Sequence, residues 1–479
     1  MDMSNTAITM SAPASVFRRR RAALGAQLRR PLVILAGHAR ARNYLANTYP
    51  FRAGSNYLYF GGPPMEGAAW IIEPGCDGDK GCVLLRMPQT VDDAVWTGEM
   101  AGDDAIAAAA GIPESALHPP NRLTKLLGDR KAVFVAPPCP VSERWMADCK
   151  IAPADDADRQ IIIAMRLGKD ENEQTAMRRA ADATVQAHLA AMRACRPGRS
   201  ENDVVAALLS TYVAHRCETS FTPIVTIHGE VLHPHSYGHA LEPGRLLLVD
   251  SGGEEHTGYA CDVTRTYPVS GTWNSLQGQL YDVVVRAEQA AIDACVPGKR
   301  YRDVHDIAAR EICAGLIDVG LLRGNVDSLL ERRAHTLFFV HGIGHLIGLD
   351  VHDMEDFGDF AGYAPGRTRR PGFGDKFLRL DRDLAPGFGV TIEPGIYVVP
   401  AIWRNQDMTA PFADVVNRPL VEQLLAAAFG GIRVEDTVLV RAGAKPVGQK
   451  AETKLDGPEV LTAALPKTRD ALSAMVGGG

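Results

Sequence analysis

The chain has 479 residues, of which 46% are hydrophobic and 23% charged, and its formal net charge is −6. This composition predicts a soluble globular protein of two or three domains, and it argues against nucleic acid as a partner because no strong basic field is present. No apolar run reaches the roughly 18 residues of a membrane span, and the N-terminus lacks the pattern of a secretory signal. Nine scattered cysteines without a CxxC pair are typical of a cytoplasmic protein.

The first third of the chain alternates short apolar runs with Ala-rich helical segments. Helical character over residues 15–30 ends before a proline, and the apolar run Pro31–Gly37 is typical of a buried strand. Further strands are predicted at Ala69–Pro74, Gly81–Arg86 and Val133–Ala136, and a further helix at Gly102–Ala110. This alternation predicts an α/β domain over residues 15–155.

A bridging segment is expected at Asp155–Lys169, and the chain then changes character. A long helix is predicted over Lys169–Arg196, because acidic residues begin it, basic residues end it and Pro-Gly follows. Three further helices and six strands are predicted: helices at Ser200–His215, Leu276–Cys295 and Tyr301–Val319, and strands at Phe221–Gly229, Arg245–Gly252, Tyr259–Val269, around His341, Val390–Pro400 and Gly431–Val440. Blocks of helices and antiparallel strands predict an α+β catalytic domain over residues 156–465, with a long loop at Phe357–Lys376.

Three histidines lie in the segment VHGIGHLIGLDVHD at residues 340–353. His341, His345 and His352 are interleaved with glycines, which disfavour a helix, so we expect an extended or bent segment whose backbone is closely approached. A single histidine is more often an ordinary core residue. Three together among apolar residues indicate a metal site or a route for proton transfer.

Five carboxylates lie in predicted strands or at their ends: Asp250, Asp262, Glu393, Glu435 and Asp436. Carboxylates are disfavoured in strands and are costly to bury without a partner, although a surface turn or an ion pair would explain any one of them. Asp250 and Asp262 are twelve residues apart, a spacing that lets two antiparallel strands present them side by side. With His345, such carboxylates suit Mn²⁺, Fe²⁺, Co²⁺ or Zn²⁺, and two ions about 3.5–4 Å apart can activate a shared water.

The segments LLLVDSG, GYACDVTRTYP, HGIGHLIGLDVHD, TIEPGIY and GIRVED resemble those of the pita-bread metallopeptidases of family M24, which include methionine aminopeptidase, aminopeptidase P and prolidase. The resemblance implies an α+β fold with a C-terminal pita-bread domain of the creatinase/aminopeptidase type, preceded by a creatinase-like α/β N-terminal domain. It also implies a centre of two divalent metal ions, most often Mn²⁺, with Zn²⁺, Co²⁺ or Fe²⁺ as alternatives. The implied ligands are Asp250, Asp262, His345, Glu393 and Glu435.

The resemblance implies different roles for these ligands. Asp262, Glu435 and a bridging hydroxide would serve both ions, and Glu393 would also help to deprotonate the nucleophilic water. Arg433 shares a strand face with Glu435 and is expected to anchor the carboxylates, with Tyr397 as another supporting group. Ordinary packing is the alternative for Arg433 and Tyr397.

Three further histidines match active-site positions of the family. His233, in GEVLHPH, matches the histidine near the scissile carbonyl, where it and the metals would stabilise an oxyanion. His341 and His352 match two histidines of which one contacts the substrate and the other helps a proton to reach the leaving proline nitrogen.

The N-terminal segments narrow the expected function. YPFRAGSNYLYFG and VWTG resemble the N-terminal domain of aminopeptidase P, which methionine aminopeptidases lack, and creatinases lack the full ligand set. The resemblance therefore implies an Xaa-Pro aminopeptidase, which releases the N-terminal residue from peptides with proline second through attack by the metal-bridging hydroxide. It further implies a homodimer or homotetramer, and we expect no nucleic-acid or membrane partner.

Three departures from the family pattern leave alternatives open. The interval from Asp250 to Asp262 has one residue more than usual, which we assign to a hairpin at Glu254–Thr257. The intervals from His345 to Glu393 and from Glu393 to Glu435, 48 and 42 residues, look long for bacterial aminopeptidase P and are closer to eukaryotic-type prolidase. Arg379 resembles the prolidase arginine that binds a dipeptide's C-terminal carboxylate, although it could equally be an exposed loop residue. The alternatives are an Xaa-Pro dipeptidase and, from another class, a metal-free binding protein on the same fold.

Overall fold

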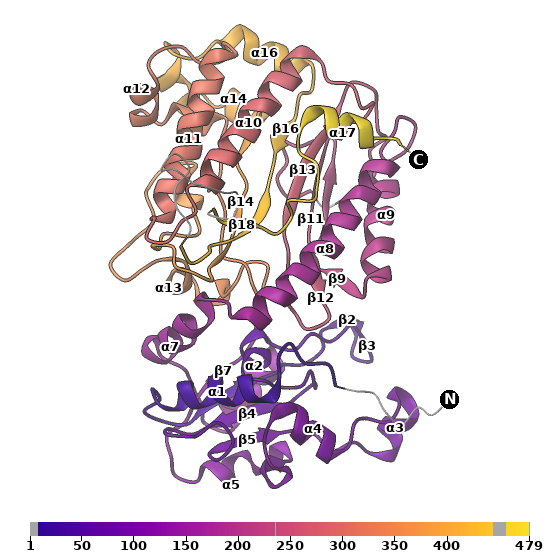
Figure 1. Cartoon of the computed structure of the whole chain (residues 1–479), viewed down its shortest axis with the longest axis vertical. Helices are drawn as coiled ribbons and strands as arrows, with labels where there is room; N and C mark the ends of the chain where they lie inside the picture. Colours follow the sequence, from indigo (N-terminus) through magenta and orange to yellow (C-terminus); the bar gives the residue numbers. More distant parts are fainter. Residues whose placement is uncertain (1–7, 235, 444–456, 479) are drawn as a thin grey trace. The chain divides into compact units, whose positions relative to one another are not determined.

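The computed structural model describes residues 8–234, 236–443 and 457–478, which divide into two compact units (Figure 1). The first unit runs to Leu167 and takes in Asp356–Ala361, and the second comprises Gly168–Glu355 and the described residues from Gly362 onward. Among the described residues, no helix combines the length and the apolar character that crossing a bilayer would require.

A mixed sheet organises the first unit. Its strands are β1 (Leu32–Leu35), β4 (Ala69–Ile72), β5 (Cys82–Leu85), β6 (Leu117–His118), β7 (Val133–Val135) and β8 (Ala152–Pro153). Their order is β6-β5-β4-β1-β7-β8, with β1 antiparallel to β4 and parallel to β7. Every residue of β1 and β4 is buried, which explains why these strands are continuous apolar runs in the sequence.

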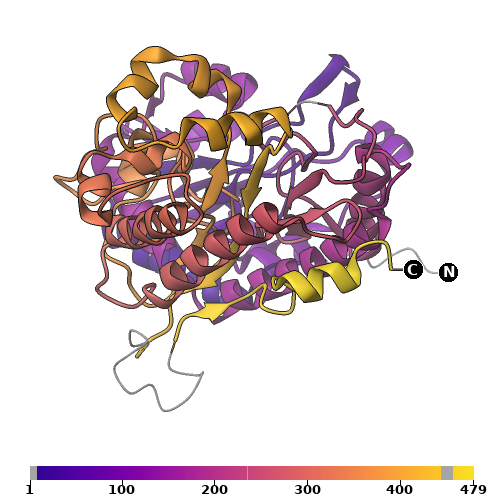
Figure 2. The same ribbon diagram turned by 90° about the horizontal axis from the view of Figure 1, so that it is seen from above.

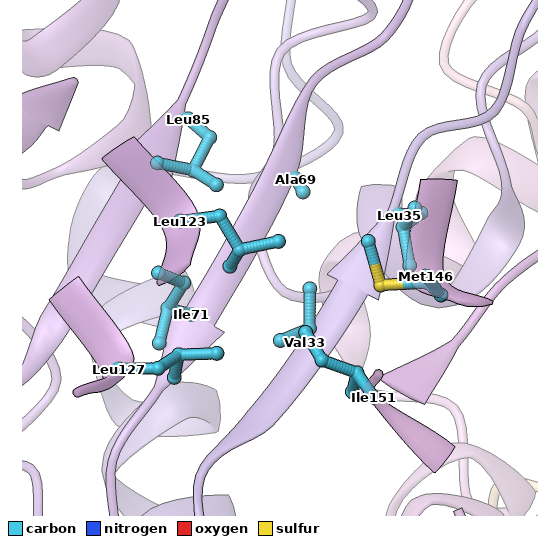
Figure 3. Close-up of a cluster of buried hydrophobic side chains, with 9 residues drawn as sticks. All are labelled: Val33, Leu35, Ala69, Ile71, Leu85, Leu123, Leu127, Met146 and Ile151. Carbon is cyan, nitrogen blue, oxygen red and sulfur yellow. The ribbon is translucent and has the colours of Figure 1, made fainter. Parts of the chain in front are cut away.

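Helices and a small hairpin complete the first unit. The helices are α1 (Ala14–Gly25), α2 (Ser55–Tyr59), α3 (Val91–Thr97), α4 (Asp103–Ala110), α5 (Leu123–Leu127), α6 (Pro140–Asp148) and α7 (Asp156–Leu167), and the hairpin joins β2 (Ala41–Tyr44) to β3 (Asn47–Thr48). Side chains from β1, β4 and β5 pack with those of α5 and α6 to form a core (Figure 3). The members of this core are Val33, Leu35, Ala69, Ile71, Leu85, Leu123, Leu127, Met146 and Ile151.

The bridging segment expected at Asp155–Lys169 is largely helical, which the sequence interpretation did not specify. α7 occupies most of the segment and buries Ile162, Ile163 and Leu167, which share one helical face. Asp155 accepts hydrogen bonds from the backbone N–H groups of residues 157 and 158, and thereby satisfies donors at the helix start. The acidic beginning of the segment is the start of a helix, which the bridge interpretation overlooked.

Long helices in antiparallel pairs form much of the second unit. They are α8 (Glu171–Ala194), α9 (Glu201–Ala214), α10 (Ser275–Asp293) and α11 (Tyr301–Asp318), with shorter helices at α12 (Val326–Glu331), α14 (Pro400–Arg404), α15 (Gln406–Thr409), α16 (Arg418–Ala426) and α17 (Arg469–Met475). α8 packs on α9 and α10 on α11, while α17 lies beside α8 and α10 (Figure 2). A reciprocal pair of hydrogen bonds between Asp170 and Glu173 caps α8, as its acidic start predicts.

Short antiparallel strands complete the second unit. They are β9 (Cys217–Thr219), β10 (Ile224–Thr226), β11 (Leu246–Ser251), β12 (Gly253–Glu255), β13 (Val263–Pro268), β14 (Gly389–Ile392), β15 (Gly395–Tyr397), β16 (Gly431–Arg433), β17 (Asp436–Leu439) and β18 (Glu459–Val460). β11 lies between β10 and β13, and the pairing of β11 with β13 places Asp250 opposite Thr264. Asp262 directly precedes β13, so the two aspartates lie at adjoining ends of paired strands.

The segment around His341 is not a regular strand, contrary to expectation. Its one described bridge joins Leu346 to Val390 of β14, and the remainder is irregular. A Cβ added at Gly344 would lie 2.2 Å from the Thr391 carbonyl oxygen, so a neighbouring backbone does approach the segment closely. This packing confirms the predicted close approach and explains why glycine occupies the position. The expected loop at Phe357–Lys376 is also interrupted, by α13 (Asp359–Gly362) and by single turns at its two ends.

Candidate metal centre

The five expected ligands come from five places in the second unit. Asp250 is the last but one residue of β11, Asp262 precedes β13, Glu393 lies between β14 and β15, Glu435 lies between β16 and β17, and His345 lies in the irregular segment joined to β14. The Asp250, Asp262, His345 and Glu435 side chains are buried, and Glu393 is partly buried. Strand pairing therefore assembles residues that lie up to 185 positions apart in the sequence.

The distances among these groups suit ligands of a shared metal ion. His345 Nε2 lies 3.5 Å from Asp262 Oδ2 and 3.7 Å from Glu393 Oε1. Asp262, His345 and Glu435 each offer one atom within 4.8 Å of the others. Two ligands held 2.0–2.2 Å from one ion at a tetrahedral angle lie about 3.4 Å apart, so only small movements would complete such a site.

Some buried carboxyl oxygens at the site lack a hydrogen-bond partner, and a bound cation would be a suitable partner for them. Asp250 Oδ1 and Asp262 Oδ1 are buried without a hydrogen-bond partner among the described residues. Burial raises the pKa of the Asp262 carboxyl well above its usual range, and the nearby Asp250 carboxylate raises it further. Burial likewise raises the pKa values of Glu435 and Glu393, with Asp262 adding to both. These oxygens are therefore suited to divalent cations, which would offset the repulsion among them.

His345 presents one free nitrogen to the carboxylates. Its Nδ1 lies 2.9 Å from the Leu346 carbonyl oxygen and must donate to it, because a carbonyl only accepts. Burial lowers the pKa of His345, so the ring is neutral and Nε2 carries a lone pair toward Asp262 and Glu393. This tautomer and orientation are those of a metal-ligating imidazole.

Arg433 forms hydrogen bonds or ion pairs with several groups at this site. Its guanidinium pairs with the Asp250 carboxylate, donates to the Tyr397 hydroxyl at 2.9 Å, and donates through Nε to Thr264 Oγ1 at 3.1 Å. The Thr264 hydroxyl in turn donates to Glu435 Oε2 at 2.7 Å. Arg433 and Tyr397 thus contact the expected ligands or their partners rather than filling space alone.

Two of the expected active-site histidines lie near the expected ligands or the side chains that support them. The His341 ring is 2.8 Å from the Tyr397 hydroxyl through Nε2, and burial with the nearby Arg433 guanidinium lowers its pKa to about 3. The ring of His352 lies 4.1 Å from that of His345, measured between centroids. The structure therefore places one histidine beside the Arg433 network and the other beside an expected ligand.

The remaining expected residues are more exposed. His233 lies after β10 on an exposed turn, where partial burial and the Arg433 guanidinium lower its pKa. Arg379 pairs with Glu355, whose other oxygen contacts Nδ1 of His352. The hydrogen bond to His352, with the help of Arg379, lowers the pKa of Glu355 to about 2, so this carboxylate is ionised at neutral pH. Arg379 is consequently engaged by an acid of its own chain.

Sequence reasoning missed three groups that contact expected site residues. Thr264 supports Glu435, and Thr391 accepts from the His345 backbone N–H at 3.1 Å and donates to Glu393 at 3.4 Å. Each threonine lies two positions from an expected carboxylate, Thr264 after Asp262 and Thr391 before Glu393, and this spacing in a strand would have indicated a shared face. Glu355, which contacts His352 and Arg379, carried no such signal, because it begins a single helical turn outside the strands.

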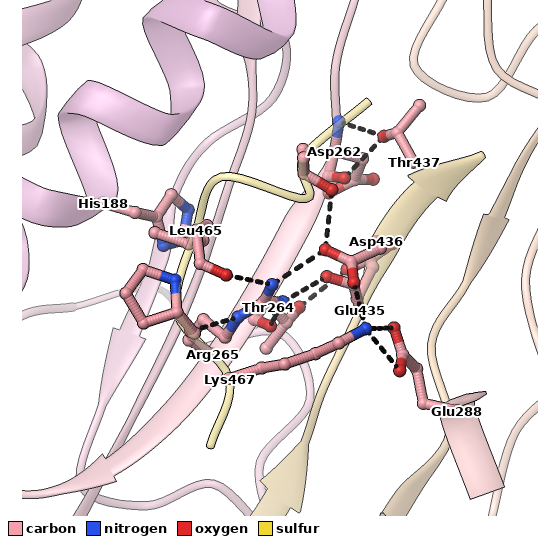
Figure 4. A network of polar contacts seen from close by, with 12 residues as sticks. His188, Asp262, Thr264, Arg265, Glu288, Glu435, Asp436, Thr437, Leu465 and Lys467 are labelled. Atoms are coloured by element: carbon pink, nitrogen blue, oxygen red, sulfur yellow. Dashed lines mark hydrogen bonds and ion pairs between the residues drawn. The ribbon is translucent and has the colours of Figure 1, made fainter. Parts of the chain in front are cut away.

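Asp436, the fifth anomalous carboxylate, belongs to a different network (Figure 4). It accepts from Arg265 Nη2 at 2.8 Å and from Lys467 Nζ at 2.8 Å, and Lys467 also pairs with Glu288. Glu435 and Asp436 are sequence neighbours at a strand start, so their side chains point to opposite faces. Asp436 is thus an ion-paired structural acid, which was the alternative that the sequence left open for each of these carboxylates.

Comparisons with known proteins agree with this geometry. The profile of metallopeptidase family M24 matches residues 175–442, and that of the aminopeptidase P N-terminal domain matches residues 17–134. The chain is 29% identical to the Xaa-Pro aminopeptidase of Haemophilus influenzae over 95% of each sequence. It is 30% identical to Xaa-Pro aminopeptidase 1 of Streptomyces coelicolor, over 94% of this chain and 84% of that one.

Solved structures of aminopeptidase P share the fold. The Pseudomonas aeruginosa aminopeptidase PepP aligns with a TM-score of 0.78 at 28% identity, covering 98% of this chain and 99% of that one. A zinc-substituted Escherichia coli aminopeptidase P in complex with product aligns with the same TM-score at 27% identity, over 97% and 98% of the two chains. These matches confirm the predicted fold class, a pita-bread domain preceded by an aminopeptidase P-type N-terminal domain. Because the M24 profile spans more than half of its length, the chain belongs to metallopeptidase family M24.

Proposed function

We propose that this chain is an Xaa-Pro aminopeptidase that uses two divalent metal ions to release the N-terminal residue of peptides with proline second. The observation that carries the proposal is the convergence of Asp262, His345 and Glu435, with unpartnered buried oxygens on Asp250 and Asp262. Full-length relatives named Xaa-Pro aminopeptidase and the N-terminal domain match support the choice of substrate.

The five expected ligands fit a pair of ions. Asp250, Asp262, His345, Glu393 and Glu435 would hold them, with Asp262 and Glu435 shared between both. Four carboxylates balance the charge of two divalent cations. We propose that both ions are Mn²⁺, and Zn²⁺, Co²⁺ or Fe²⁺ have compatible ligand preferences. When bound, such ions lower the pKa of a water molecule and polarise the substrate carbonyl.

The chain's own side chains would bind the peptide and move protons. Glu393 lies at the partly buried edge of the site and is proposed to accept the proton of the attacking water. His233, on the exposed rim, is proposed to donate to the developing oxyanion. His352 and His341 are proposed to contact the substrate and to bring a proton to the proline nitrogen, and Tyr397 with Arg433 would hold His341 in place.

The dipeptidase alternative depends on Arg379. A dipeptide's C-terminal carboxylate would need this guanidinium, but the Arg379 side chain is 40% exposed and already pairs with the ionised Glu355. A carboxylate ligand would have to displace Glu355 from it. The ion pair therefore favours the aminopeptidase, with Arg379 steadying Glu355 and His352.

Assays of purified protein loaded with Mn²⁺ test the proposal. We expect Xaa-Pro-Xaa tripeptides to be cleaved at least ~10-fold more efficiently than Xaa-Pro dipeptides, a difference of about 1.4 kcal/mol in transition-state stabilisation. Arg379→Gln should leave this ratio unchanged, as should Arg332→Gln, a matched exposed arginine that pairs with Asp414. A preference for dipeptides that only Arg379→Gln abolishes would establish the dipeptidase instead.

Metal counting separates the enzyme from a metal-free binding protein. We expect about two ions per chain after Mn²⁺ loading, and loss of turnover on chelation with recovery on adding Mn²⁺ back. Fewer than one ion per chain without turnover would indicate the binding role. The proposal also includes a cytoplasmic location and a homodimeric or homotetrameric state. Light scattering of the purified protein measures the oligomeric state.

A further inference from the structure

A second cluster of potential metal ligands lies in the same unit but outside the proposed centre. His305 lies on α11, His335 in a single helical turn at Ala334–Leu337, and Asp375 in another at Asp375–Phe377. The three residues are 2%, 5% and 6% exposed, and each offers one ligand atom within 4.8 Å of the other two. They share no residue with the proposed pair of ions.

His305 and Asp375 of this cluster lie too far apart for an ordinary hydrogen bond. His305 Nε2 lies 3.6 Å from Asp375 Oδ1, beyond the 2.7–3.2 Å of an ordinary hydrogen bond. Nδ1 of His305 and Nδ1 of His335 are buried without a hydrogen-bond partner in the described part of the chain. Two ligands on one ion at a tetrahedral angle lie about 3.4 Å apart, so the spacing of His305 and Asp375 suits a shared ion better than a direct bond.

The Asp375 carboxylate is oriented by a second side chain, as the carboxylate ligands of metal ions commonly are. Arg333 Nη2 lies 3.0 Å from Asp375 Oδ2, while Oδ1 faces His305. The same guanidinium donates to the carbonyl oxygens of Pro371 and Phe373, so it is fixed from several sides. One oxygen of Asp375 is thus anchored and the other is left for an ion, as in metal sites whose ligands are oriented by outer partners.

The cluster can be reached from outside the protein. A pocket of about 520 Å³ is lined by His335, Asp375, Arg333, Asp306 and Arg370, among others. Asp306 and Arg370 form a bidentate ion pair beside it, with both contacts near 2.6 Å. Burial lowers the pKa of His335 to about 4, so its imidazole is neutral and able to bind metal at pH 7.

We propose that His305, His335 and Asp375 bind a single divalent transition-metal ion, Zn²⁺ by its preference for imidazole and carboxylate in tetrahedral sites, with the fourth position open to the pocket. The ion would join α11 to the two turns. The proposal does not depend on the peptidase activity, because none of its ligands belongs to the other centre.

One side chain connects the two regions. The ring of Phe339 lies 5.2 Å from that of His305 and 5.2 Å from that of His341, measured between centroids. An ion on His305 would therefore restrict a row of ring contacts that ends at His341 of the proposed active site. Zn²⁺ at this cluster is expected to rigidify these ring contacts rather than to take part in the reaction.

Zinc counting on the full chain tests the site directly. Asp262→Asn/Glu435→Gln weakens the proposed catalytic centre, and after equilibrium dialysis against Zn²⁺ this variant should still retain one tightly held ion per chain. Adding His335→Gln should remove that ion, whereas adding His215→Gln, an exposed histidine whose ring contacts the Thr211 carbonyl of α9, should not. Elemental analysis gives the count, and circular dichroism verifies folding.

A second ligand variant guards against misfolding. If His335→Gln does not fold, Asp375→Asn in the same background serves instead, since the amide keeps the shape of the side chain. X-ray absorption of the retained zinc should show two imidazole ligands. Retention of the ion in both His335→Gln and Asp375→Asn, or absence of any ion from Asp262→Asn/Glu435→Gln, would overturn the proposal. Neither result would bear on the Xaa-Pro aminopeptidase proposal, which depends on the turnover of the unmodified chain.

Discussion

The hydroxyl of Tyr397 lies between two groups of the proposed active site, and its removal is a sharp test of that arrangement. The side chain is fully buried, and its oxygen accepts from Arg433 Nη1 at 2.9 Å. His341 Nδ1 donates to the Gly342 carbonyl at 2.7 Å, so Nε2 of this neutral ring must accept, and it accepts from the Tyr397 hydroxyl at 2.8 Å. The Gly342 carbonyl therefore fixes the tautomer of His341, and the Tyr397 hydroxyl helps to fix the orientation of its ring.

Tyr397→Phe removes both hydrogen bonds and keeps the ring. Arg433 and His341 are then each left with a buried polar nitrogen that has lost a partner. Losing a bond from a charged donor and one to a neutral acceptor costs about 2–4 kcal/mol of unfolding free energy. A misplaced His341 should also lower kcat for a tripeptide by about 10–100-fold, or about 1.4–2.7 kcal/mol in activation free energy.

Tyr267→Phe supplies a matched control. Tyr267 is also fully buried, but its hydroxyl has no hydrogen-bond partner among the described residues. Its removal should leave the unfolding free energy unchanged or raise it, and should leave kcat unchanged. Denaturant unfolding and tripeptide kinetics measured side by side report both quantities. Equal behaviour of the two variants would refute the bridging role of Tyr397.

Three further outcomes follow from the structure. Asp262→Asn should lower kcat/KM by more than ~100-fold and lower the Mn²⁺ count, because changes to groups that merely contact ligands already cost 10–100-fold. Lys467→Met leaves Glu288 and Asp436 buried without this ammonium and should cost about 3–5 kcal/mol in chemical denaturation. Burial lowers the pKa of His188 to about 4 from 6.5, so the unfolded state binds more protons below pH 6.5 and stability falls as pH drops from there toward 4. The His188 contribution is about 2 kcal/mol at pH 5, and His188→Gln should make the pH dependence shallower by that amount.

Helices were the most predictable part of the fold. The expected helix at Lys169–Arg196 is α8 (Glu171–Ala194), and the expected Leu276–Cys295 is α10 (Ser275–Asp293). Both begin with a capping box, which is local chemistry that a sequence displays. Strand ends were less predictable, because an apolar run continues past the point where pairing stops: the predicted Phe221–Gly229 pairs only over β10 (Ile224–Thr226).

The irregular segments depended on tertiary contacts that no local pattern encodes. The segment at His341 has the composition of a strand, but it has no continuous pairing partner in the described structure, and its glycines admit Leu378 and Thr391 instead. Family membership and fold class were predictable from ordered motifs and are confirmed by the family profiles. The individual residue roles stay predictions, although the structure brings the expected ligands together.

The two neighbouring acids Glu435 and Asp436 show what decides between a structural and a functional carboxylate. Both are buried at the start of one strand, and both break the apolar pattern equally. Asp436 meets two cations, Arg265 and Lys467, which lower its pKa below its ordinary value. Glu435 meets mainly other acids, and its pKa is raised well above its usual range. A buried acid that is paired with the protein's own cations needs no further partner, whereas one surrounded by acids requires an external cation. Only the folded chain distinguishes the two cases.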